Sequence, residues 1–569
     1  MKSHLRELLA RASEKAAKGG ELNATDLPPL LLEAPSQKEF GDLATNFALL
    51  WAKKLRKPPR AVADVILKHL EDPERILERA EIAGPGFINF TFAPKFFYDR
   101  LRTLGREQRW LPDIGRREKV QVEFASVNPT GPLHVGHGRV AVIGDVLARL
   151  LGAVGFEVER EYYVNDAGRQ IELLGRSIYA RYQELLGASW PFPEDGYPGE
   201  YVKQLAACAR EQWGEQFRAG ETDEAIALLS RFGCENMLAV IRDDLGKFGI
   251  TFDSFISEKE MRERGEVEQA IALLRARGLV YDHDGAQWFR ATEFGDDKDR
   301  TVVKSDGELT YFASDIAYHR SKFERGNQRL VNVWGADHHG YVNRLKAALQ
   351  ALGYDPQRLS VVLVQMVNLT RQGEPVRMGK RSGEFVSLSE VLEEVGRDAA
   401  RFFFLMRKAD SHLDFDLELA KKESTENPVF YVQYAHARIA SIFEQARQKK
   451  LGVEVLDPQS IALERLTLRE ELDLIKAVVQ FPEAVENSAT QLEPHYLVAY
   501  LLDLAGQFHR YYNRYRVISK DEPLTCARLL LVQNVQQALG RGLELLGISA
   551  PLRMGSRQDL GEPAGLGPA

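Results

Sequence analysis

The sequence predicts an α/β protein with a parallel sheet, and three observations predict it. In the middle of the chain, short apolar segments typical of buried parallel strands alternate with helical patterns. From Arg397 to Gly540, long amphipathic patterns contain few glycines or prolines, as in a helical bundle. The 569 residues also exceed what one hydrophobic core usually contains. We therefore expect an α/β domain with a parallel sheet between an α+β domain and an all-α bundle.

Residues 1–106 are predicted to form the α+β domain. Apolar residues at helical spacing indicate helices at 5–17 and 43–55. A Gly-Pro-Gly turn then leads into an apolar strand within 83–92. A charged, glycine-containing stretch at 105–119 is the predicted linker to the next domain.

Residues 107–396 are predicted to form the α/β domain with the parallel sheet. Its first strand shows apolar residues at every second position, and apolar residues at helical spacing follow at 140–150. Residues 170–295 are predicted to be a helical insertion that splits the sheet. The strands themselves are predicted at 120–124, 158–164, 330–334 and 359–367.

Residues 397–554 are predicted to form the helical bundle. The Gly- and Pro-rich segment 555–569 is predicted to be a disordered tail.

Composition narrows the class of protein and its compartment. The net charge of −7 does not indicate a nucleic-acid binder, although phosphate contacts need only local Lys and Arg. Three widely separated cysteines, Cys208, Cys234 and Cys526, predict a reducing compartment without a disulfide framework. No apolar run approaches the ~18 residues of a membrane span. Glu7 and Glu14 distinguish the first helix from a transit peptide. We therefore predict a cytoplasmic protein with no membrane partner.

The most informative segment is the turn after the first predicted strand of the sheet, Glu123-Phe-Ala-Ser-Val-Asn-Pro-Thr-Gly-Pro-Leu-His-Val-Gly-His-Gly-Arg139. Ligands bind at the carboxyl ends of strands in open α/β sheets, and the helix start favours phosphate through its free N–H groups and dipole. His134 and His137 can donate hydrogen bonds to phosphate oxygens, and Gly136 lets a base approach the backbone. The segment therefore predicts a nucleoside triphosphate site.

The alternative for this His-x-x-His pair is a structural or metal-binding role. A zinc site needs three or four ligands, yet the chain holds only 12 His and 3 Cys, with no Cys-x-x-Cys nearby. We therefore assign no metal ligand.

The turn resembles the HIGH signature of class I aminoacyl-tRNA synthetases. The resembling residues are Val127, Asn128, Pro129, Thr130, Gly131, Pro132, Leu133, His134, Val135, Gly136 and His137.

A second motif, at 372–384, resembles the KMSKS loop of the same enzymes, with Arg377-Met-Gly-Lys-Arg381 at its five positions. Only Met378 and Lys380 match. Alone, a basic loop with glycine is more often a solvated turn, but in a chain that also carries the HIGH-like turn it predicts a function. A mobile cation there can favour the transition state in which charge builds on pyrophosphate, and Lys380 is the first choice for it.

The two motifs together imply an ATP site, with Mg²⁺ as the phosphate counter-ion. The ATP-binding residues implied by the resemblance are His134, Gly136, His137, Met378, Gly379 and Lys380. The catalytic residues implied by it are His134, His137, Lys380 and Arg377.

Further strings are similar to arginyl-tRNA synthetases, and the resemblance covers residues 1–554. They include Tyr163-Val-Asn-Asp-Ala-Gly-Arg-Gln170 and Trp334-Gly-Ala-Asp-His-His-Gly-Tyr341. The resemblance implies a Rossmann catalytic domain, an N-terminal domain that contacts the tRNA elbow and a C-terminal anticodon-binding bundle. The implied reaction joins L-arginine to tRNA(Arg) through an arginyl-adenylate formed with ATP. We expect a monomer.

An arginine pocket should present carboxylates and neutral acceptors to the planar fork of five N–H donors in a guanidinium. By position in the resembling motifs, Asp315, Tyr311 and Glu123 are assigned to the guanidinium end. Ser126 and Asn128 are assigned to the α-amino and carboxylate end. His339 stands where many eukaryotic members have glutamine, so its role stays open. The alternatives are a helix-terminal carboxylate without ligand for Asp315 and an edge-strand charge for Glu123.

A segment of the bundle, 507–516, interleaves aromatic residues with arginines. Unpaired bases can stack on Tyr or Arg planes while other arginines meet phosphates. Tyr511, Arg514 and Tyr515 are therefore predicted to contact tRNA. For the similar aromatic pattern at 430–438, core packing explains the spacing equally well.

Two other functions remain open from sequence. A different class I synthetase or adenylyl transferase would keep both nucleotide motifs but lack the Glu123, Tyr311 and Asp315 set. An inactive RNA-binding relative is suggested by the departures from KMSKS, but His134, His137 and Lys380 argue against it.

Overall fold

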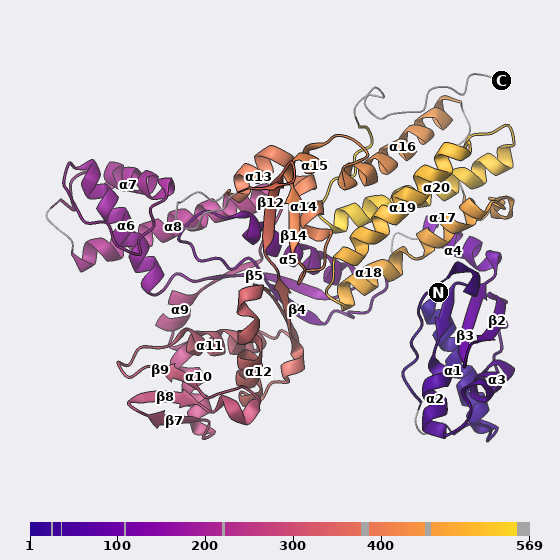
Figure 1. Ribbon diagram of the computed structural model, residues 1–569, viewed down its shortest axis with the longest axis horizontal. Coiled ribbons are helices and arrows are strands. Elements are labelled where there is room, and N and C mark those ends of the chain that lie inside the picture. The colour runs from indigo at the N-terminus through magenta and orange to yellow at the C-terminus, as the bar shows by residue number, and fades with distance from the viewer. Residues whose placement is uncertain are drawn as a thin grey trace. The chain divides into compact units, whose positions relative to one another are not determined.

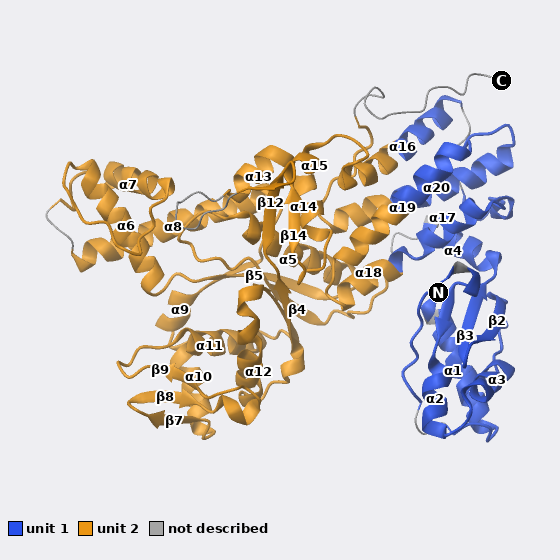
Figure 2. Ribbon diagram, viewed as in Figure 1, with its two compact units in different colours: residues 1–110, 438–482, 504–538 blue, residues 111–437, 483–503, 539–569 orange. Residues whose placement is uncertain are grey.

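The computed structural model describes residues 1–23, 27–35, 37–106, 110–218, 222–376, 386–449 and 457–554. The chain divides into two compact units (Figure 2), and each is described by itself. The first comprises residues 1–110, 438–482 and 504–538, and the second comprises residues 111–437, 483–503 and 539–569.

The first unit begins with a small antiparallel sheet in the order β1-β3-β2, and helices pack on it (Figure 1). The predicted helix at 43–55 starts later than expected. Its first residues, Leu43–Thr45, form strand β1, with the side chains of Leu43 and Thr45 buried, and pair with β3. The elements are α1 (Lys2–Lys18), β1 (Leu43–Thr45), α2 (Phe47–Leu55), α3 (Pro59–Lys68), β2 (Leu77–Ala83) and β3 (Phe87–Phe92).

Long helices make up the rest of the first unit and continue into the second, as the sequence predicts. In the first unit, α4 packs on α17, and the Tyr98 hydroxyl donates to the backbone oxygen of Leu466 at 2.9 Å. The helices are α4 (Pro94–Arg106), α16 (Pro428–Gln448), α17 (Arg469–Val479), α18 (Phe481–Thr490), α19 (His495–Arg514) and α20 (Glu522–Leu545). Among the described residues, no helix is both long and apolar enough to cross a bilayer.

The second unit is built on a five-stranded parallel sheet in the order β11-β10-β4-β5-β6. The strands are β4 (Lys119–Glu123), β5 (Glu157–Val164), β6 (Ser254–Ser257), β10 (Arg329–Gly335) and β11 (Leu359–Val364). The predicted α/β class and the parallel sheet are therefore confirmed.

Helix α5 (Val135–Ala153) joins β4 to β5 and packs on the sheet. Gly144 makes this close approach possible, because a Cβ there would lie 2.2 Å from Cγ of Phe124. The chain extends the sheet from β4 through β5 to β6 and later returns to the opposite side of β4 as β10. The direction in which successive strands are added to the sheet therefore reverses between β4 and β10. We call this position the switch point, and at such a point the carboxyl ends of the strands leave room for a ligand.

The segment 170–295, predicted to be a helical insertion, contains only helices through Lys247 and both strands and helices after it. It starts with α6 (Arg169–Leu185), α7 (Glu200–Trp213) and α8 (Asp223–Lys247), which pack on one another. Strand β6 then joins the parallel sheet, and a separate antiparallel sheet follows, in the order β7-β8-β9. The remaining elements are α9 (Glu258–Glu263), α10 (Glu266–Ala276), β7 (Val280–His283), β8 (Ala286–Phe289) and β9 (Arg300–Val303).

The rest of the second unit surrounds the switch point. The predicted strand at 359–367 ends as β11 at Val364, and β12 begins a new sheet at Val367 in the order β13-β12-β14. These elements are α11 (Tyr311–Glu324), α12 (Val342–Ala351), β12 (Val367–Arg371), β13 (Glu374–Pro375), α13 (Leu388–Val395), α14 (Arg397–Leu405), β14 (Leu413–Asp416) and α15 (Leu417–Lys421).

Candidate active site

The start of α5 is organised by the two histidines of the HIGH-like turn. His134 is the N-cap residue, and its Nδ1 accepts from the backbone N–H groups of Gly136 at 3.1 Å and His137 at 3.4 Å. In return, Nδ1 of His137 accepts from the backbone N–H of His134 at 3.3 Å. Because both Nδ1 atoms accept, each neutral ring carries its proton on Nε2. The rings stack with centroids 3.5 Å apart, so this pair can present two N–H donors to one anion.

The second motif adjoins this turn through the residues that follow it. Ser387 forms an isolated antiparallel bridge with His134, and the backbone N–H of Leu388 donates to the oxygen of Leu133 at 2.8 Å. The loop positions Arg377, Met378, Gly379 and Lys380 lie outside the described residues. The chain that leaves this loop therefore returns to the start of α5.

Arg139, one turn into α5, joins this helix to the segments that precede β12 and β14. Its guanidinium is buried and donates to the backbone oxygens of Gln365 at 2.9 Å, Ser411 at 2.8 Å and Lys408 at 2.9 Å. Burial lowers the pKa of Arg139 to about 10. Sequence analysis did not identify this residue as part of the site, although it directly follows the HIGH-like motif.

A strained turn connects β4 to the HIGH-like motif. Ala125 has a φ of 56°, in the left-handed region that few residues other than glycine adopt. The turn aims Ser126 back at the sheet, where its hydroxyl donates to Oε1 of Glu123 at 3.0 Å and accepts from the backbone N–H of Tyr163 at 3.1 Å. The Tyr162 hydroxyl holds the next residue by donating to the backbone oxygen of Val127 at 2.7 Å. The end of β4 is therefore fixed before any substrate arrives.

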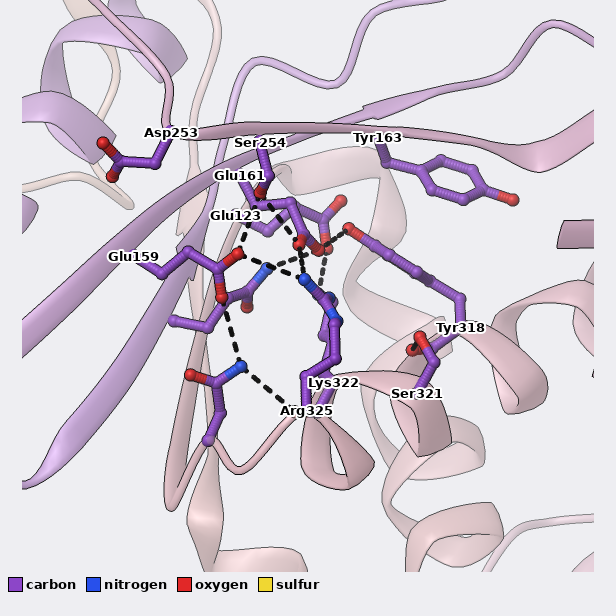
Figure 3. Close-up of polar contacts among 12 residues, drawn as sticks. Glu123, Glu159, Glu161, Tyr163, Asp253, Ser254, Tyr318, Ser321, Lys322 and Arg325 are labelled. Carbon is purple, nitrogen blue, oxygen red and sulfur yellow. Dashed lines mark hydrogen bonds and ion pairs between the residues drawn. The ribbon is translucent and has the colours of Figure 1, made fainter. Parts of the chain in front are cut away.

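Glu123 does not stand alone at this position, as Figure 3 shows. Its Oε2 accepts from the ammonium of Lys322 on α11 at 2.6 Å, and both side chains are buried. Sequence analysis did not predict Lys322, and Glu123 is neither an edge-strand charge nor an unpaired carboxylate in this structure.

Asp315, one turn into α11, has a different environment. It accepts a short hydrogen bond from the Tyr341 hydroxyl. Burial raises the pKa of Asp315 to about 7, and the negative charges of Glu123 and Glu258 act in the same direction. Tyr341 and Lys322 oppose this effect. A carboxyl group with a raised pKa at the switch point is a candidate functional group.

The remaining predicted arginine-binding residues lie around the same edge. Tyr311 starts α11 and is 56% exposed, and its hydroxyl lies 3.5 Å from the position that a Cβ on Gly168 would take. Asn128 donates to the side-chain oxygen of Gln170 at 2.5 Å. His339 is exposed in the short helix Ala336–Tyr341 after β10. The fold thus brings Glu123, Ser126 and Asp315 close to the sheet, with Tyr311 and His339 on exposed positions.

The structure corrects one of the three residues predicted to contact tRNA. Tyr511 is fully buried, and its hydroxyl donates to Glu471 at 3.3 Å, so no base can stack on it here. Arg528 also donates to Glu471, at 2.8 Å. Arg514 is exposed and pairs with Glu470 at 3.2 Å, while Tyr515 is partly buried. Tyr511 is therefore a core residue of the first unit, and only Arg514 and Tyr515 remain available for RNA.

Comparison with known proteins identifies the class to which this fold and site belong. A sequence model of the catalytic domain of class I tRNA synthetases (R) matches residues 102–425. The helix start with its stacked histidines, at the switch point of a parallel sheet, is thus part of a class I synthetase domain.

Matches to the regions on either side of this domain, and to relatives over the whole chain, identify one family within this class. Models of the arginyl tRNA synthetase N terminal domain and of the DALR anticodon binding domain match residues 3–92 and 432–554. The arginine–tRNA ligases of Geobacter sp. (strain M21) and Citrifermentans bemidjiense are each 51% identical, over 97% of this chain and 100% of their own. The solved arginyl-tRNA synthetase of Thermus thermophilus is 27% identical with a TM-score of 0.75, over 97% of this chain and 100% of that one. The chain belongs to the arginyl-tRNA synthetase family, as its motifs predict.

Proposed function

We propose that this chain binds ATP and L-arginine at the switch point between β4 and β10 and joins them there as arginyl-adenylate, before transfer to tRNA(Arg). The overall reaction is the ATP-dependent ligation of arginine to tRNA. The observation that carries the proposed site is that one sheet edge holds both a helix start with two imidazole donors and a carboxylate, Asp315, with a raised pKa.

The phosphate half of the site is assigned to the start of α5. His134 and His137 each accept from the backbone through Nδ1, and we assign their Nε2–H groups to donate to ATP phosphates by the position of both rings at the start of α5. Gly136 keeps the backbone accessible to the nucleotide. From the sequence motif, Lys380 and then Arg377 are assigned to stabilise the departing pyrophosphate, with Met378 and Gly379 beside ATP.

Mg²⁺ is assigned only as the counter-ion that accompanies the ATP phosphates. The part of the chain that the structure describes contains no group of three or more His, Cys, Asp or Glu side chains placed to hold a metal ion. We therefore assign no metal ligand to the protein and derive no step through the ion.

The arginine half is assigned to the end of β4 and the start of α11. Asp315 and Glu123 are assigned to the guanidinium, which needs carboxylates as acceptors. Burial raises the pKa of Asp315, so its ionised form gains most from pairing with a cation. Tyr311 supplies a neutral hydroxyl beside it. Ser126 and Asn128 are assigned to the α-amino and carboxylate groups, and His339 to the rim of the pocket.

Two further regions of the chain are assigned to tRNA binding. Residues 1–106 are assigned to the tRNA elbow and residues 397–554 to the anticodon, where Arg514 and Tyr515 are the remaining candidates for contact with bases and phosphates. We also propose that the enzyme works as a monomer in the cytoplasm.

Arginine binding is expected to depend on pH through Asp315. Its carboxyl group, with a pKa of about 7, must lose its proton to pair with a guanidinium. As the pH is raised, the arginine KM in tRNA charging should therefore decrease about tenfold per pH unit up to about pH 6.5. Above about pH 7.5 it should be constant. Burial of Asp315 sets this range first, and Tyr341, Glu123, Glu258 and Lys322 adjust it.

The control for this measurement is Asp315→Asn, whose arginine KM should be high and nearly independent of pH over the same range. By linkage, ionising Asp315 with its raised pKa costs stability, so the arginine-free protein should melt at a lower temperature as the pH rises from 4 to 7. A flat arginine KM from pH 5.5 to 8 in the unmodified enzyme would remove Asp315 from the guanidinium site.

A further inference from the structure

The turn 124–133, between β4 and α5, joins the two halves of the proposed site. Ser126 and Asn128 in this turn are assigned to arginine, and His134 directly after it is assigned to ATP. The residues of the turn belong to no helix or strand. Two of them are prolines, which have no N–H group to form a backbone hydrogen bond. The shape of the turn therefore depends on contacts from other parts of the fold.

Two of these contacts come from the helices α6–α8. The ends of the turn are held by the contacts already described, from the Tyr162 hydroxyl at Val127 and from a backbone N–H at Leu133. Between these points, Tyr201 on α7 and Gln170 on α6 each contact the turn through a hydrogen bond. Helices that lie outside the parallel sheet thus reach the centre of the turn.

Tyr201 holds the backbone of the turn. Its hydroxyl donates to the backbone oxygen of Thr130 at 2.7 Å. The next residue, Gly131, leaves room for this contact, because a Cβ there would lie only 3.1 Å from the hydroxyl oxygen. Burial raises the pKa of Tyr201, so the hydroxyl keeps the proton that it donates.

The ring of Tyr201 is anchored in the hydrophobic core that α6, α7 and α8 share (Figure 1). This core contains Leu174 from α6, Val202 from α7 and Leu229 from α8, all without exposed surface. Close-packed cores are nearly incompressible and transmit displacements. Tyr201 therefore links the position of the three helices to the position of the turn.

Gln170 holds a side chain of the turn. It lies in the first turn of α6, and its side-chain oxygen accepts from Nδ2 of Asn128 at 2.5 Å. An amide has a donor end and an acceptor end, so this bond fixes which way the Asn128 amide faces. Asn128 is assigned to the α-amino and carboxylate groups of arginine, and Gln170 thus acts on that end of the substrate.

We propose that the helices α6–α8 position the turn for catalysis: Tyr201 fixes its backbone at Thr130 and Gln170 orients Asn128, so that arginine is held against the α-phosphate of ATP. This inference rests on the proposed function. Both are positioning residues, because each acts through the turn and neither is assigned to a substrate. A misplacement of reacting groups by about 1 Å can slow a reaction on the order of 100-fold, so a small shift of the turn has a large effect.

Tyr201→Phe removes the hydroxyl and keeps the ring in its core. The rate measured is arginine-dependent exchange of pyrophosphate into ATP, with tRNA present, which reports adenylate formation. We expect kcat for this exchange to decrease at least tenfold, because the reacting groups are less well aligned. The KM values of arginine and ATP should each stay within threefold, since Tyr201 contacts neither substrate.

The matched control is Tyr182→Phe. The Tyr182 hydroxyl, on α6, donates to the backbone oxygen of Gly214 at 2.6 Å, so this variant loses the same kind of hydrogen bond away from the turn. Both variants should melt at a similarly lowered temperature, because each loses one hydrogen bond of about 1 kcal/mol. Only Tyr201→Phe should lose exchange activity, and Tyr182→Phe should keep kcat within twofold.

Gln170→Leu tests the second contact through a different parameter. It should raise the arginine KM at least fivefold and leave the ATP KM within twofold, because it acts on the arginine end of the turn. Its control is Arg169→Gln, which changes the preceding residue, paired with Asp195 at the surface, and should leave the arginine KM within twofold. Gln170 is exposed, so this variant leaves the core unchanged and decides the question even if Tyr201→Phe does not fold.

Three results would overturn the inference: normal exchange by Tyr201→Phe, an equal loss of exchange by Tyr201→Phe and Tyr182→Phe, or a normal arginine KM for Gln170→Leu. In each case the helices support the fold without positioning the turn. If the unmodified chain itself shows no arginine-dependent exchange and attaches no arginine to tRNA, the proposed function fails. The failure of the inference and the failure of the proposed function are therefore distinct.

Discussion

Asp315→Asn is expected to raise the arginine KM in tRNA charging by roughly 100-fold or more, equivalent to about 3 kcal/mol. The substitution preserves the shape of the side chain and its contact with Tyr341, but removes the charge that faces the guanidinium. The site is partly desolvated, so removing the carboxylate costs the guanidinium much more binding free energy than it would in water. The ATP KM should change less than twofold.

Citrulline provides the complementary measurement for Asp315→Asn. It has nearly the shape of arginine but no charge, so its reactivity relative to arginine should increase in this variant. The matched control is Asp282→Asn, in which the lost carboxylate pairs with Arg275 at the surface of β7. An arginine KM within twofold of normal for Asp315→Asn would show that the guanidinium binds elsewhere.

His134→Asn is expected to lower kcat by about 100- to 1000-fold, the usual effect of losing one transition-state contact of about 3–4 kcal/mol. Asparagine caps helices well, so it can keep the N-cap that His134 now provides. It cannot replace the Nε2–H group that we assign to the phosphate. The melting temperature should therefore stay nearly constant while kcat falls.

His134→Ala separates the two roles of this residue. It should show the same loss of kcat and also a lower melting temperature, because losing an N-cap costs about 1 kcal/mol. If His134→Asn retained normal kcat, capping would be the main role of the residue, and the phosphate site would have to be reassigned.

The parallel sheet was predictable because its strands are apolar segments between strong helical patterns. Strands β4, β5, β10 and β11 all lie where this pattern placed them. The missed strands β6–β9 are only four residues long and partly exposed, so they have neither the length nor the periodicity that identifies a strand. The early end of β11 at Val364 and the start of a second sheet at Val367 were missed because residues 359–367 were taken as one apolar run, although the polar Gln365 stands at the break.

Candidate site residues that lie close together in the sequence could be predicted from it. Residues that reach the site only through packing of distant elements could not. The turn with His134 and His137 carries its chemistry within a few residues. Lys322 was missed because a lysine on a helix is usually on a solvated face. Its spacing from Asp315 and Tyr318, seven and four residues, nevertheless places it on their face of α11.

Tyr511 shows the opposite error, in which a buried residue was assigned to RNA. It lies three and seven residues after Phe508 and Leu504, both fully buried, and so shares their face of α19. The aromatic and basic composition of the segment obscured this periodicity. A helical face of large apolar residues is therefore better evidence for the core than for base stacking.

The most direct test of the function is to incubate tRNA with this chain, ATP and each of the twenty amino acids in turn, and to count aminoacyl-tRNA, AMP and pyrophosphate. We expect arginine alone to be attached, with one AMP and one pyrophosphate released for each arginyl-tRNA formed. Attachment of a different amino acid, or formation of arginyl-tRNA without AMP, would contradict it.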